Sequence, residues 1–242
     1  MNEILRYFGT DSRKTKIIFL PYAGGYSLAF RSLHPDLENY FQIISIEPPG
    51  HGTSRLPLVS DIKELVELYL KAILPEIKNH SFILFGHSMG GLLSYLLAQK
   101  LERLGIFPEH IFISAACPPD YKKEIVSDLT DNDFLQYLIK LGGIPSELSK
   151  EKDFLELFLP VIRSDFKAIE LFEHEDYTLI ESPVHIFNGV SDSAPYKFEK
   201  NWCKWVKHAD FHSFPGGHMF LLDIPKEVAE KIKSLALKRS EV

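Results

Sequence analysis

Ser88, in the pentapeptide Gly-His-Ser-Met-Gly at residues 86–90, is the side chain of this sequence best suited to nucleophilic catalysis. A short apolar run at residues 82–85 precedes it, and an apolar stretch of helical length follows at residues 91–104. Gly-x-Ser-x-Gly between a buried strand and a helix is typical of a nucleophile elbow, a sharp turn that holds the serine hydroxyl above a sheet. The two glycines leave room for the strained backbone of such a turn, so we predict that Ser88 is a nucleophile.

A serine hydroxyl is a poor nucleophile at neutral pH, so Ser88 needs a histidine to take its proton and a carboxylate to orient that histidine. With such an elbow the chain order is serine, acid, histidine. His218 lies in Pro-Gly-Gly-His-Met-Phe at residues 215–220, between a candidate strand and the last predicted helix, as this order requires. We predict that His218 is the base. The rivals lie before the acid, in a long insertion, or next to or within strands: His51, His87, His174, His185, His208 and His212.

For the acid, the order favours Asp192, which follows the apolar run at residues 184–187 after a short loop. A carboxylate on the loop that leaves this strand can reach the imidazole from behind. Asp176 precedes the strand, Asp210 begins the next one, and Asp223 lies beyond the histidine. Asp192 could also serve only to form a turn, as Asp often does. We predict it to be the acid, and we interpret His87 as a packing or polar neighbour of the elbow.

Two backbone N–H groups are needed to bind the oxyanion that forms when a serine attacks an acyl group. One is expected from Met89, the residue after the nucleophile. The other is expected from Ala23 or Tyr22, in a loop after an early strand, where Gly24 and Gly25 would let a substrate come close. A glycine turn without catalytic duty is the alternative. A second loop at residues 47–54 lies at the same sheet edge, and we interpret its His51 as an ordinary loop residue.

The elements that must position these residues alternate along the chain. Short runs without polar alternation, typical of strands buried on both faces, occupy residues 16–20, 41–46, 81–85, 110–114 and 184–187, with a further candidate at 210–214. Helical spacing of apolar residues occupies 61–77 and 91–104, and a last helix begins near Pro225. This alternation predicts an α/β fold with a doubly wound, mostly parallel sheet.

One segment breaks the alternation. Between Pro118 and Pro183 we find no convincing strand but three amphipathic stretches, at residues 131–141, 152–159 and 161–172. We predict a single domain, residues 1–242, with a helical lid insertion at about 119–182, because such insertions carry specificity on a fixed scaffold. The alternative is a structural helical subdomain remote from the site.

Composition narrows the class of protein. The 242 residues are 45% hydrophobic and 25% charged, and the net charge of −6 gives no reason to expect nucleic-acid binding. No apolar run reaches the length of a membrane span, and the first residues do not resemble a signal peptide. Cys117 and Cys203 have no CxxC spacing, and the histidines after residue 200 lack a carboxylate cluster. We therefore expect a cytoplasmic protein without a disulfide framework or a metal site.

With these residues in hand, the chain resembles the type II (external, editing) thioesterases of nonribosomal peptide and polyketide synthesis, which belong to the α/β-hydrolase superfamily. Within them it is most similar to the surfactin-type branch, which shares His51 where many members have arginine. The resemblance covers nearly the whole chain and rests on the segments at residues 19–27, 47–53, 84–91, 100–108, 141–145, 183–189 and 216–222.

The resemblance implies hydrolysis of misprimed acyl or aminoacyl thioesters from the phosphopantetheine arm of carrier domains, which regenerates a stalled synthetase. It implies that Ser88 attacks, His218 is the base, Asp192 orients it, and Met89 with Ala23 binds the oxyanion. The pantetheine is part of the substrate, so no dissociable cofactor is expected. The partners implied are carrier domains, which the lid would contact, and we expect a monomer.

Three other functions are compatible with the same residues. A carboxylesterase or lipase for small esters would use the same triad chemistry. An acyltransferase would pass the acyl group to an amine or alcohol in place of water. A binding protein that has lost catalysis on the same scaffold is disfavoured because every triad position is filled.

Overall fold

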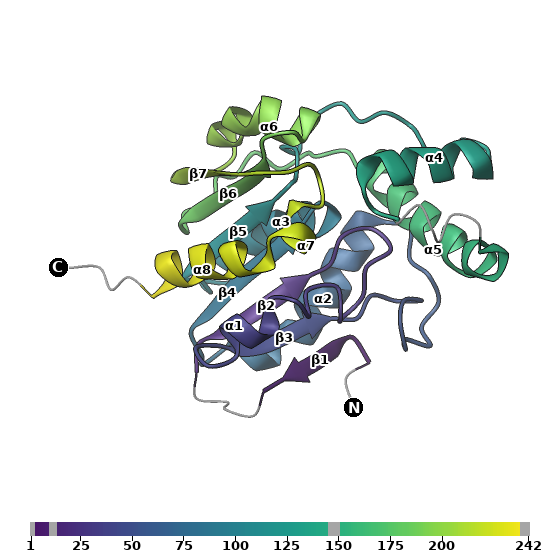
Figure 1. Cartoon of the computed structure of the whole chain (residues 1–242). Coiled ribbons are helices and arrows are strands. Elements are labelled where there is room, and N and C mark those ends of the chain that lie inside the picture. The colour runs from purple at the N-terminus through teal and green to yellow at the C-terminus, as the bar shows by residue number, and fades with distance from the viewer. Residues whose placement is uncertain (1–2, 10–13, 145–150, 238–242) are drawn as a thin grey trace.

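A seven-stranded sheet forms the middle layer of the computed structural model, which describes residues 3–9, 14–144 and 151–237 (Figure 1). The strand order is β1-β3-β2-β4-β5-β6-β7. All neighbours from β3 to β7 pair in parallel, and only β1 is antiparallel, which confirms the predicted mostly parallel α/β sheet. The strands are β1 (Leu5–Phe8), β2 (Lys16–Leu20), β3 (Gln42–Ile46), β4 (Phe82–His87), β5 (His110–Ser114), β6 (Val184–Gly189) and β7 (Ala209–Phe214).

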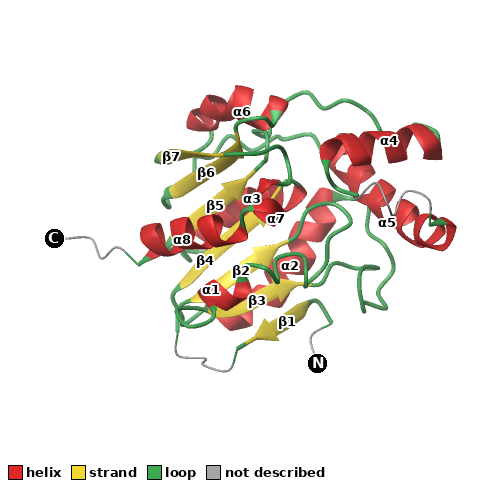
Figure 2. Cartoon of the chain, in the orientation of Figure 1, coloured by secondary structure: helices red, strands yellow, loops and turns green. Residues whose placement is uncertain are grey.

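Helices cover both faces of this sheet (Figure 2), and the apolar runs of the strands explain why. In β2, Ile18 and Leu20 join the core beneath α2 and α3, while Ile17 and Phe19 join the core on the side of α1 and α8. Successive strand residues point to opposite faces, so an uninterrupted apolar run needs cover on both sides. The helices of the two layers are α1 (His34–Leu37), α2 (Ile62–Ile77), α3 (Met89–Arg103) and α8 (Pro225–Ala236).

Strand β1 and the short helices after β6 are elements that the sequence analysis did not anticipate. In β1, Leu5 is buried, but Tyr7 is 47% exposed. This edge strand has only four residues and one buried position, so its pattern is too short to separate from a loop. The others are α6 (Ser193–Phe198), a 3₁₀ helix (Glu199–Lys204) and α7 (Phe220–Asp223).

Two helices of the insertion, α4 (Asp131–Leu141) and α5 (Lys152–Leu171), lie between β5 and β6 in the chain and to one side of the sheet (Figure 1). They share a small apolar cluster of their own, with Phe134, Leu138 and Ile162 among its buried members. The prediction of two stretches, 152–159 and 161–172, was wrong, because α5 continues through Pro160. Leu159 and Ile162, on either side of the proline, are buried in the same cluster, and a continuous helix keeps that face together.

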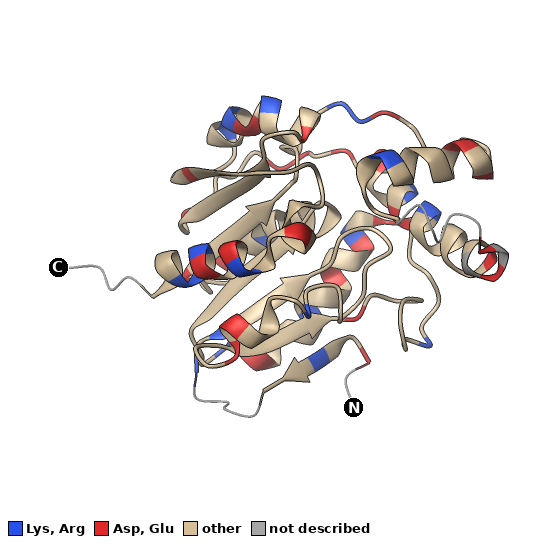
Figure 3. Ribbon diagram, in the orientation of Figure 1, with Lys and Arg blue, Asp and Glu red and all other residues tan. Residues whose placement is uncertain are grey.

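Positive and negative side chains are interspersed over the helices, and the strands are nearly free of them (Figure 3). Within the described parts of the chain, no helix combines the length and the apolar character that crossing a membrane requires. Cys117 and Cys203 are both free thiols. Of the motifs that carry the family resemblance, Pro145 at the end of residues 141–145 lies outside the described residues.

Three histidines lie side by side across the sheet, on β5, β6 and β7. His110 and His185 share a hydrogen bond of 3.0 Å, and the rings of His185 and His212 are 5.7 Å apart. Burial, together with the positive charge that its two neighbours would carry, lowers the pKa of His185 from 6.5 to about 4. His185 is therefore neutral in the folded protein near neutral pH.

We expect His185→Phe to reduce the loss of stability on acidification. The unfolded chain takes up a proton at this position near pH 6.5, whereas the folded chain does so only near pH 4. The free energy of unfolding therefore falls as the pH is lowered through this window, by at most about 1.4 kcal/mol per pH unit for one group. Phenylalanine does not titrate and keeps the ring stacked on Phe112.

Urea unfolding at several pH values between about 7 and 4 measures this slope. His34 contributes to the background in both proteins, because burial lowers its pKa to about 4 as well. The exposed His80, replaced by glutamine, controls for the loss of one histidine. An unchanged slope in His185→Phe, or an equal change in the control, would contradict the prediction.

Candidate active site

Ser88 stands between β4 and α3 with a backbone that most residues avoid. Its φ of 54° and ψ of −116° leave the favoured regions for residues other than glycine, at a cost of about 1–3 kcal/mol. Its N–H donates to the Ser114 carbonyl at the end of the adjacent β5, at 2.7 Å. The surrounding sheet thus holds the strained turn in place, and α3 begins at the next residue with its N-terminal N–H groups beside the serine.

The glycines of the elbow are required by close backbone approaches. A Cβ at Gly86 would lie 1.9 Å from the Gly90 carbonyl oxygen, and a Cβ at Gly90 would lie 2.0 Å from the Leu20 carbonyl oxygen. Any side chain at either position would collide with backbone that cannot move aside. The second contact also brings the start of α3 against the end of β2, where the loop with Ala23 begins.

The structure brings Ser88, His218 and Asp192 together, although they lie after three different strands, β4, β7 and β6. His218 Nε2 lies 3.0 Å from Ser88 Oγ, and His218 Nδ1 lies 2.7 Å from Asp192 Oδ2. The side chains of the histidine and the aspartate are only 10% and 7% exposed. An ionised carboxylate only accepts hydrogen bonds, so Nδ1 carries the proton and donates it. Nε2 is then the lone-pair nitrogen that accepts from the serine hydroxyl.

Backbone hydrogen bonds hold the acid loop and the histidine loop together. The Ser191 N–H donates to the Gly216 carbonyl at 2.9 Å, and the Val190 N–H donates to the Phe214 carbonyl at 2.9 Å. These contacts fix the separation between the residues that precede His218 and those that precede Asp192. Two rival acids lie elsewhere: Asp176 pairs with Arg103, and Asp210 is 73% exposed on β7.

Ala23 and Met89 lie on the two segments that meet at the elbow, the loop after β2 and the first turn of α3. The sequence analysis expected a glycine at position 24 in order to let a substrate come close, and this reason was wrong. A Cβ there would lie 2.5 Å from Cγ1 of Ile162 on α5, so the position makes room for the insertion and not for a substrate. The Gly24 N–H donates to Asp165 at 2.7 Å and is therefore taken, so the two residues named from the sequence, Ala23 and Tyr22, stay the candidates for the second donor.

His87 is a fully buried neighbour of the triad, as the sequence analysis expected. Its Nδ1 lies 2.8 Å from Ser114 Oγ, and its ring centroid lies 5.4 Å from that of His218. Burial holds its pKa well below the usual value, and the charge that His218 would carry lowers it further. His87 is therefore a neutral ring that packs beneath the histidine loop.

His51 and Asp165 form a pair that the sequence analysis missed. Their side chains are each 3% exposed, and His51 Nε2 lies 2.9 Å from Asp165 Oδ2. We interpreted His51 as an ordinary loop residue because nothing near it in the sequence signals a partner. Asp165 is 114 residues away, on a helix whose polar positions give no local indication that one of them is buried.

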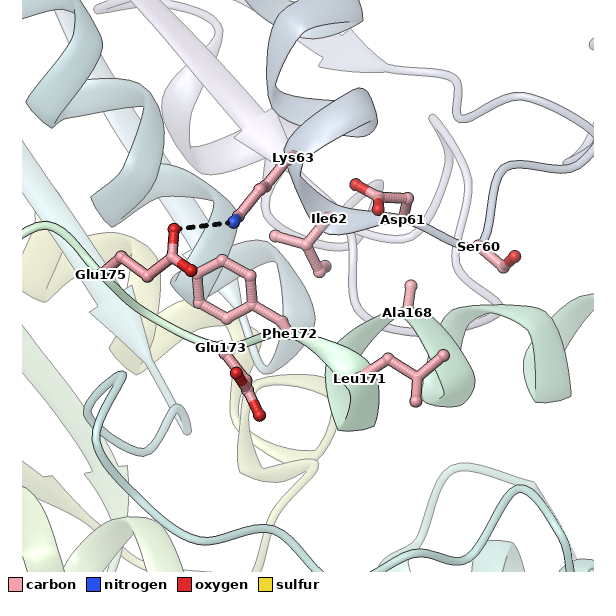
Figure 4. A pocket seen from close by; sticks show the side chains of 9 residues that line it. All are labelled: Ser60, Asp61, Ile62, Lys63, Ala168, Leu171, Phe172, Glu173 and Glu175. Atoms are coloured by element: carbon pink, nitrogen blue, oxygen red, sulfur yellow. Dashed lines mark hydrogen bonds and ion pairs between the residues drawn. The ribbon is translucent and has the colours of Figure 1, made fainter.

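A surface pocket lies apart from the triad, between the start of α2 and the end of α5 (Figure 4). An ion pair of 3.1 Å between Lys63 and Glu175 closes one side of it. None of the residues predicted for the site lines this pocket. The pocket lies where the end of α5 packs against the core. The residues that line it are Ser60, Asp61, Ile62, Lys63, Ala168, Leu171, Phe172, Glu173 and Glu175.

Known proteins are similar to this chain in architecture and in sequence. The structure of the type II thioesterase BorB from the borrelidin biosynthetic cluster superposes with a TM-score of 0.88 at 24% identity, covering 98% of each chain, which shows a common fold. The gramicidin S biosynthesis protein GrsT of Aneurinibacillus migulanus is 29% identical over 227 residues, 91% of this chain and 88% of that protein. The medium-chain S-acyl fatty acid synthase thioesterase of Homo sapiens is 31% identical over 237 residues, 94% of this chain and 88% of that enzyme.

The chain also matches the sequence pattern of a whole protein family. Residues 15–235, which include every predicted site residue and the insertion, match the family described as thioesterase domain. The family resemblance stated from the sequence motifs is thereby confirmed. This chain belongs to the thioesterase family of hydrolytic enzymes.

Proposed function

We propose that this protein is a type II thioesterase that removes misprimed acyl or aminoacyl groups from the phosphopantetheine arms of carrier domains, so that a nonribosomal peptide or polyketide synthetase can resume synthesis. The observation that carries the proposal is the chain of hydrogen bonds from Ser88 through His218 to Asp192 on a nucleophile elbow. Relatives named for the biosynthesis of gramicidin S and of anguibactin support the choice of substrate.

In the first half of the reaction the serine becomes acylated. Ser88 Oγ attacks the thioester carbonyl carbon while His218 Nε2 takes the hydroxyl proton. The tetrahedral intermediate collapses, the carbon–sulfur bond breaks, and His218 returns the proton to the departing pantetheine sulfur. The products of this step are the free carrier thiol and an ester between the acyl group and Ser88.

In the second half, water takes the place of the thiol. His218 removes a proton from a water molecule, which attacks the ester carbonyl, and the same proton passes to Ser88 Oγ as the acid departs. Asp192, which is held at 2.7 Å from Nδ1, keeps the imidazole in the required tautomer and stabilises its positive charge in both halves. The free enzyme is regenerated with no dissociable cofactor.

The N–H groups of Ala23 and Met89 are proposed to bind the oxyanion in both halves. Such donors act on charge that develops only in the transition state, so they raise kcat. The contact of Gly90 with the Leu20 carbonyl supports this assignment, because it brings the loop after β2 against the first turn of α3.

The insertion is proposed to act as a lid that meets the carrier domain and admits its arm. Two observations support this: Ile162 of α5 fills the space beside Gly24, and a Cβ at Gly142, the residue after α4, would lie 3.6 Å from Cγ of Met219, next to His218. The insertion thus contacts the loops on two sides of the serine. We infer a monomeric protein of the cytoplasm, where Cys117 and Cys203 stay reduced.

Asp192→Asn is expected to lower kcat by about 10⁴-fold while the protein stays folded. Asparagine has nearly the shape of aspartate, but its amide can favour the wrong imidazole tautomer and carries no charge to stabilise the imidazolium. Steady-state hydrolysis of a p-nitrophenyl ester, with circular dichroism to verify folding, measures the loss. The exposed Asp210→Asn serves as the matched control. An unaffected rate in Asp192→Asn would assign the acid role to another carboxylate.

The substrate class is tested by comparing three acetyl donors: an acetyl-loaded peptidyl carrier domain, acetyl-pantetheine and p-nitrophenyl acetate. We expect the largest kcat/KM for the carrier-bound thioester, because only that substrate can contact the insertion. Faster turnover of the simple ester would favour a carboxylesterase and overturn the editing function. Transfer of the acetyl group to an added amine or alcohol in place of water would indicate an acyltransferase, and no turnover at all would indicate a binding protein.

A further inference from the structure

A buried ion pair joins the insertion to both loops at the carboxyl edge of the sheet. Asp165, on α5, places Oδ2 2.9 Å from Nε2 of His51, in the loop after β3. The same oxygen accepts the Gly24 N–H at 2.7 Å, in the loop after β2. One side chain of the insertion therefore binds the backbone beside the proposed oxyanion donor, Ala23.

The hydrogen bonds define the charge of this pair. His51 Nδ1 lies 2.9 Å from the Pro49 carbonyl oxygen, which can only accept, so Nδ1 carries a proton. Nε2 faces a carboxylate oxygen and carries the second proton. Burial opposes this charge, but the hydrogen bond and the charge of Asp165 outweigh it, and with Glu47 they raise the pKa of His51 above its usual value. Both ring nitrogens of His51 thus face acceptors, an arrangement that favours the imidazolium form opposite Asp165.

The loop between β2 and the first short helix is held on both sides of Ala23. Ahead of it, the Tyr22 carbonyl accepts the Gly25 N–H at 2.8 Å. After it, the Gly24 N–H is held by Asp165, with φ at +76°. The two peptide planes that flank Ala23 are therefore fixed, and so is the direction of its own N–H.

A buried ion pair is an energetically expensive way to hold α5 against the two loops, because two apolar side chains of similar volume often stabilise such a contact at least as well. Apolar side chains could not, however, accept the Gly24 N–H. Asp165 is 2% exposed, and Ile162, one turn earlier on the same helix, already supplies the apolar contact with Gly24. The carboxylate adds what the apolar contact lacks, a fixed orientation for the peptide.

We propose that Asp165 and His51 are positioning residues for the oxyanion site: α5 orients the Gly24 peptide so that the Ala23 N–H points at the developing oxyanion, and His51 holds the Asp165 carboxylate in place. The proposal rests on the role given to Ala23 under the proposed function. It makes the stabilisation of the oxyanion depend on how the insertion packs against the loops after β2 and β3.

The test uses reactions in which any small electrophile meets Ser88. We expect Asp165→Asn to lower kcat for p-nitrophenyl acetate, and the rate of Ser88 modification by a fluorophosphonate, by about 10- to 100-fold, somewhat less than the loss of a whole oxyanion donor. KM should stay within about twofold, because the effect is confined to the transition state. Asp131→Asn, which changes an 82% exposed carboxylate of the same insertion, is the matched control and should leave both rates unchanged.

A second pair of variants separates positioning from simple loss of structure. His51→Gln removes the positive charge, whereas His51→Arg keeps it and offers several donors to the same two acceptors. We expect the glutamine variant to lower kcat as Asp165→Asn does and the arginine variant to recover most of it. If Asp165→Asn does not fold, this pair alone decides the question.

The outcomes are distinguishable from those of the proposed function. A folded Asp165→Asn with unchanged kcat, or with only KM raised, overturns the positioning role, as does equal activity of the two His51 variants. If the wild-type protein hydrolyses p-nitrophenyl acetate but not the acetyl-loaded carrier, the editing function is overturned, and the positioning role can still be tested with the ester. A wild-type protein inert to both the ester and the fluorophosphonate overturns both proposals.

Discussion

Ser88→Ala is expected to lower kcat by about 10⁶-fold and to abolish covalent labelling by a fluorophosphonate. The substitution removes the one oxygen that lies 3.0 Å from His218 Nε2, so neither a thioester nor a phosphonate can form a bond to the chain. Alanine fits the space that the serine side chain leaves and meets the same strain at a φ of 54°. We therefore expect the free energy of unfolding to change by less than about 1 kcal/mol, within the usual range for small exposed or half-buried substitutions.

The control for this variant is Ser191→Ala, which changes an exposed serine on the loop that carries Asp192. It should retain labelling and turnover. Intact-mass measurement after incubation with the phosphonate shows one adduct or none. An adduct that persists in Ser88→Ala would identify another nucleophile and refute the elbow assignment, whatever the effect on turnover.

His218→Gln is expected to have nearly the same effect on kcat, about 10⁵- to 10⁶-fold, since the serine and its base act as a unit. Glutamine can accept a hydrogen bond from Ser88 but cannot take its proton at neutral pH. Removing the base leaves the serine hydroxyl in place, so slow labelling by the phosphonate should remain detectable. That residual labelling distinguishes loss of the base from loss of the nucleophile.

His208→Gln, at an exposed position ten residues earlier, is the matched control for the histidine change. The double variant Ser88→Ala/His218→Gln should be no slower than either single variant, because each already removes the shared proton transfer. A loss of less than tenfold in His218→Gln would mean that another group takes the proton, and His87, whose ring lies 5.4 Å from that of His218, would be the next residue to replace.

The sequence alone determined the parts of this protein that rest on local pattern. The nucleophile elbow can be recognised from the sequence because the run 82–85, the pentapeptide around Ser88 and the apolar helix after it are contiguous. A strand, a turn with two glycines and a helix in this order are typical of that motif. Chain order then narrowed the base to His218 and the acid to Asp192, since each follows a recognisable strand. The parallel sheet follows from apolar runs that need cover on both faces.

Only the tertiary structure decided the features that depend on residues far apart. The continuity of α5 through Pro160 could not be predicted, because a proline locally favours a helix end and the buried face around it becomes visible only in the folded protein. The same reason explains β1, whose single buried residue has meaning only beside β3.

The reason for Gly24 was also invisible in the sequence, where the glycine suggested access for a substrate and the structure shows contact with Ile162. The pair of His51 and Asp165 is the extreme case, since 114 residues separate two polar side chains that are ordinary in their own surroundings. Local propensity reports what a segment can form. Burial and charge pairing are set by which segments meet, and that is decided by the packing of the insertion against the sheet.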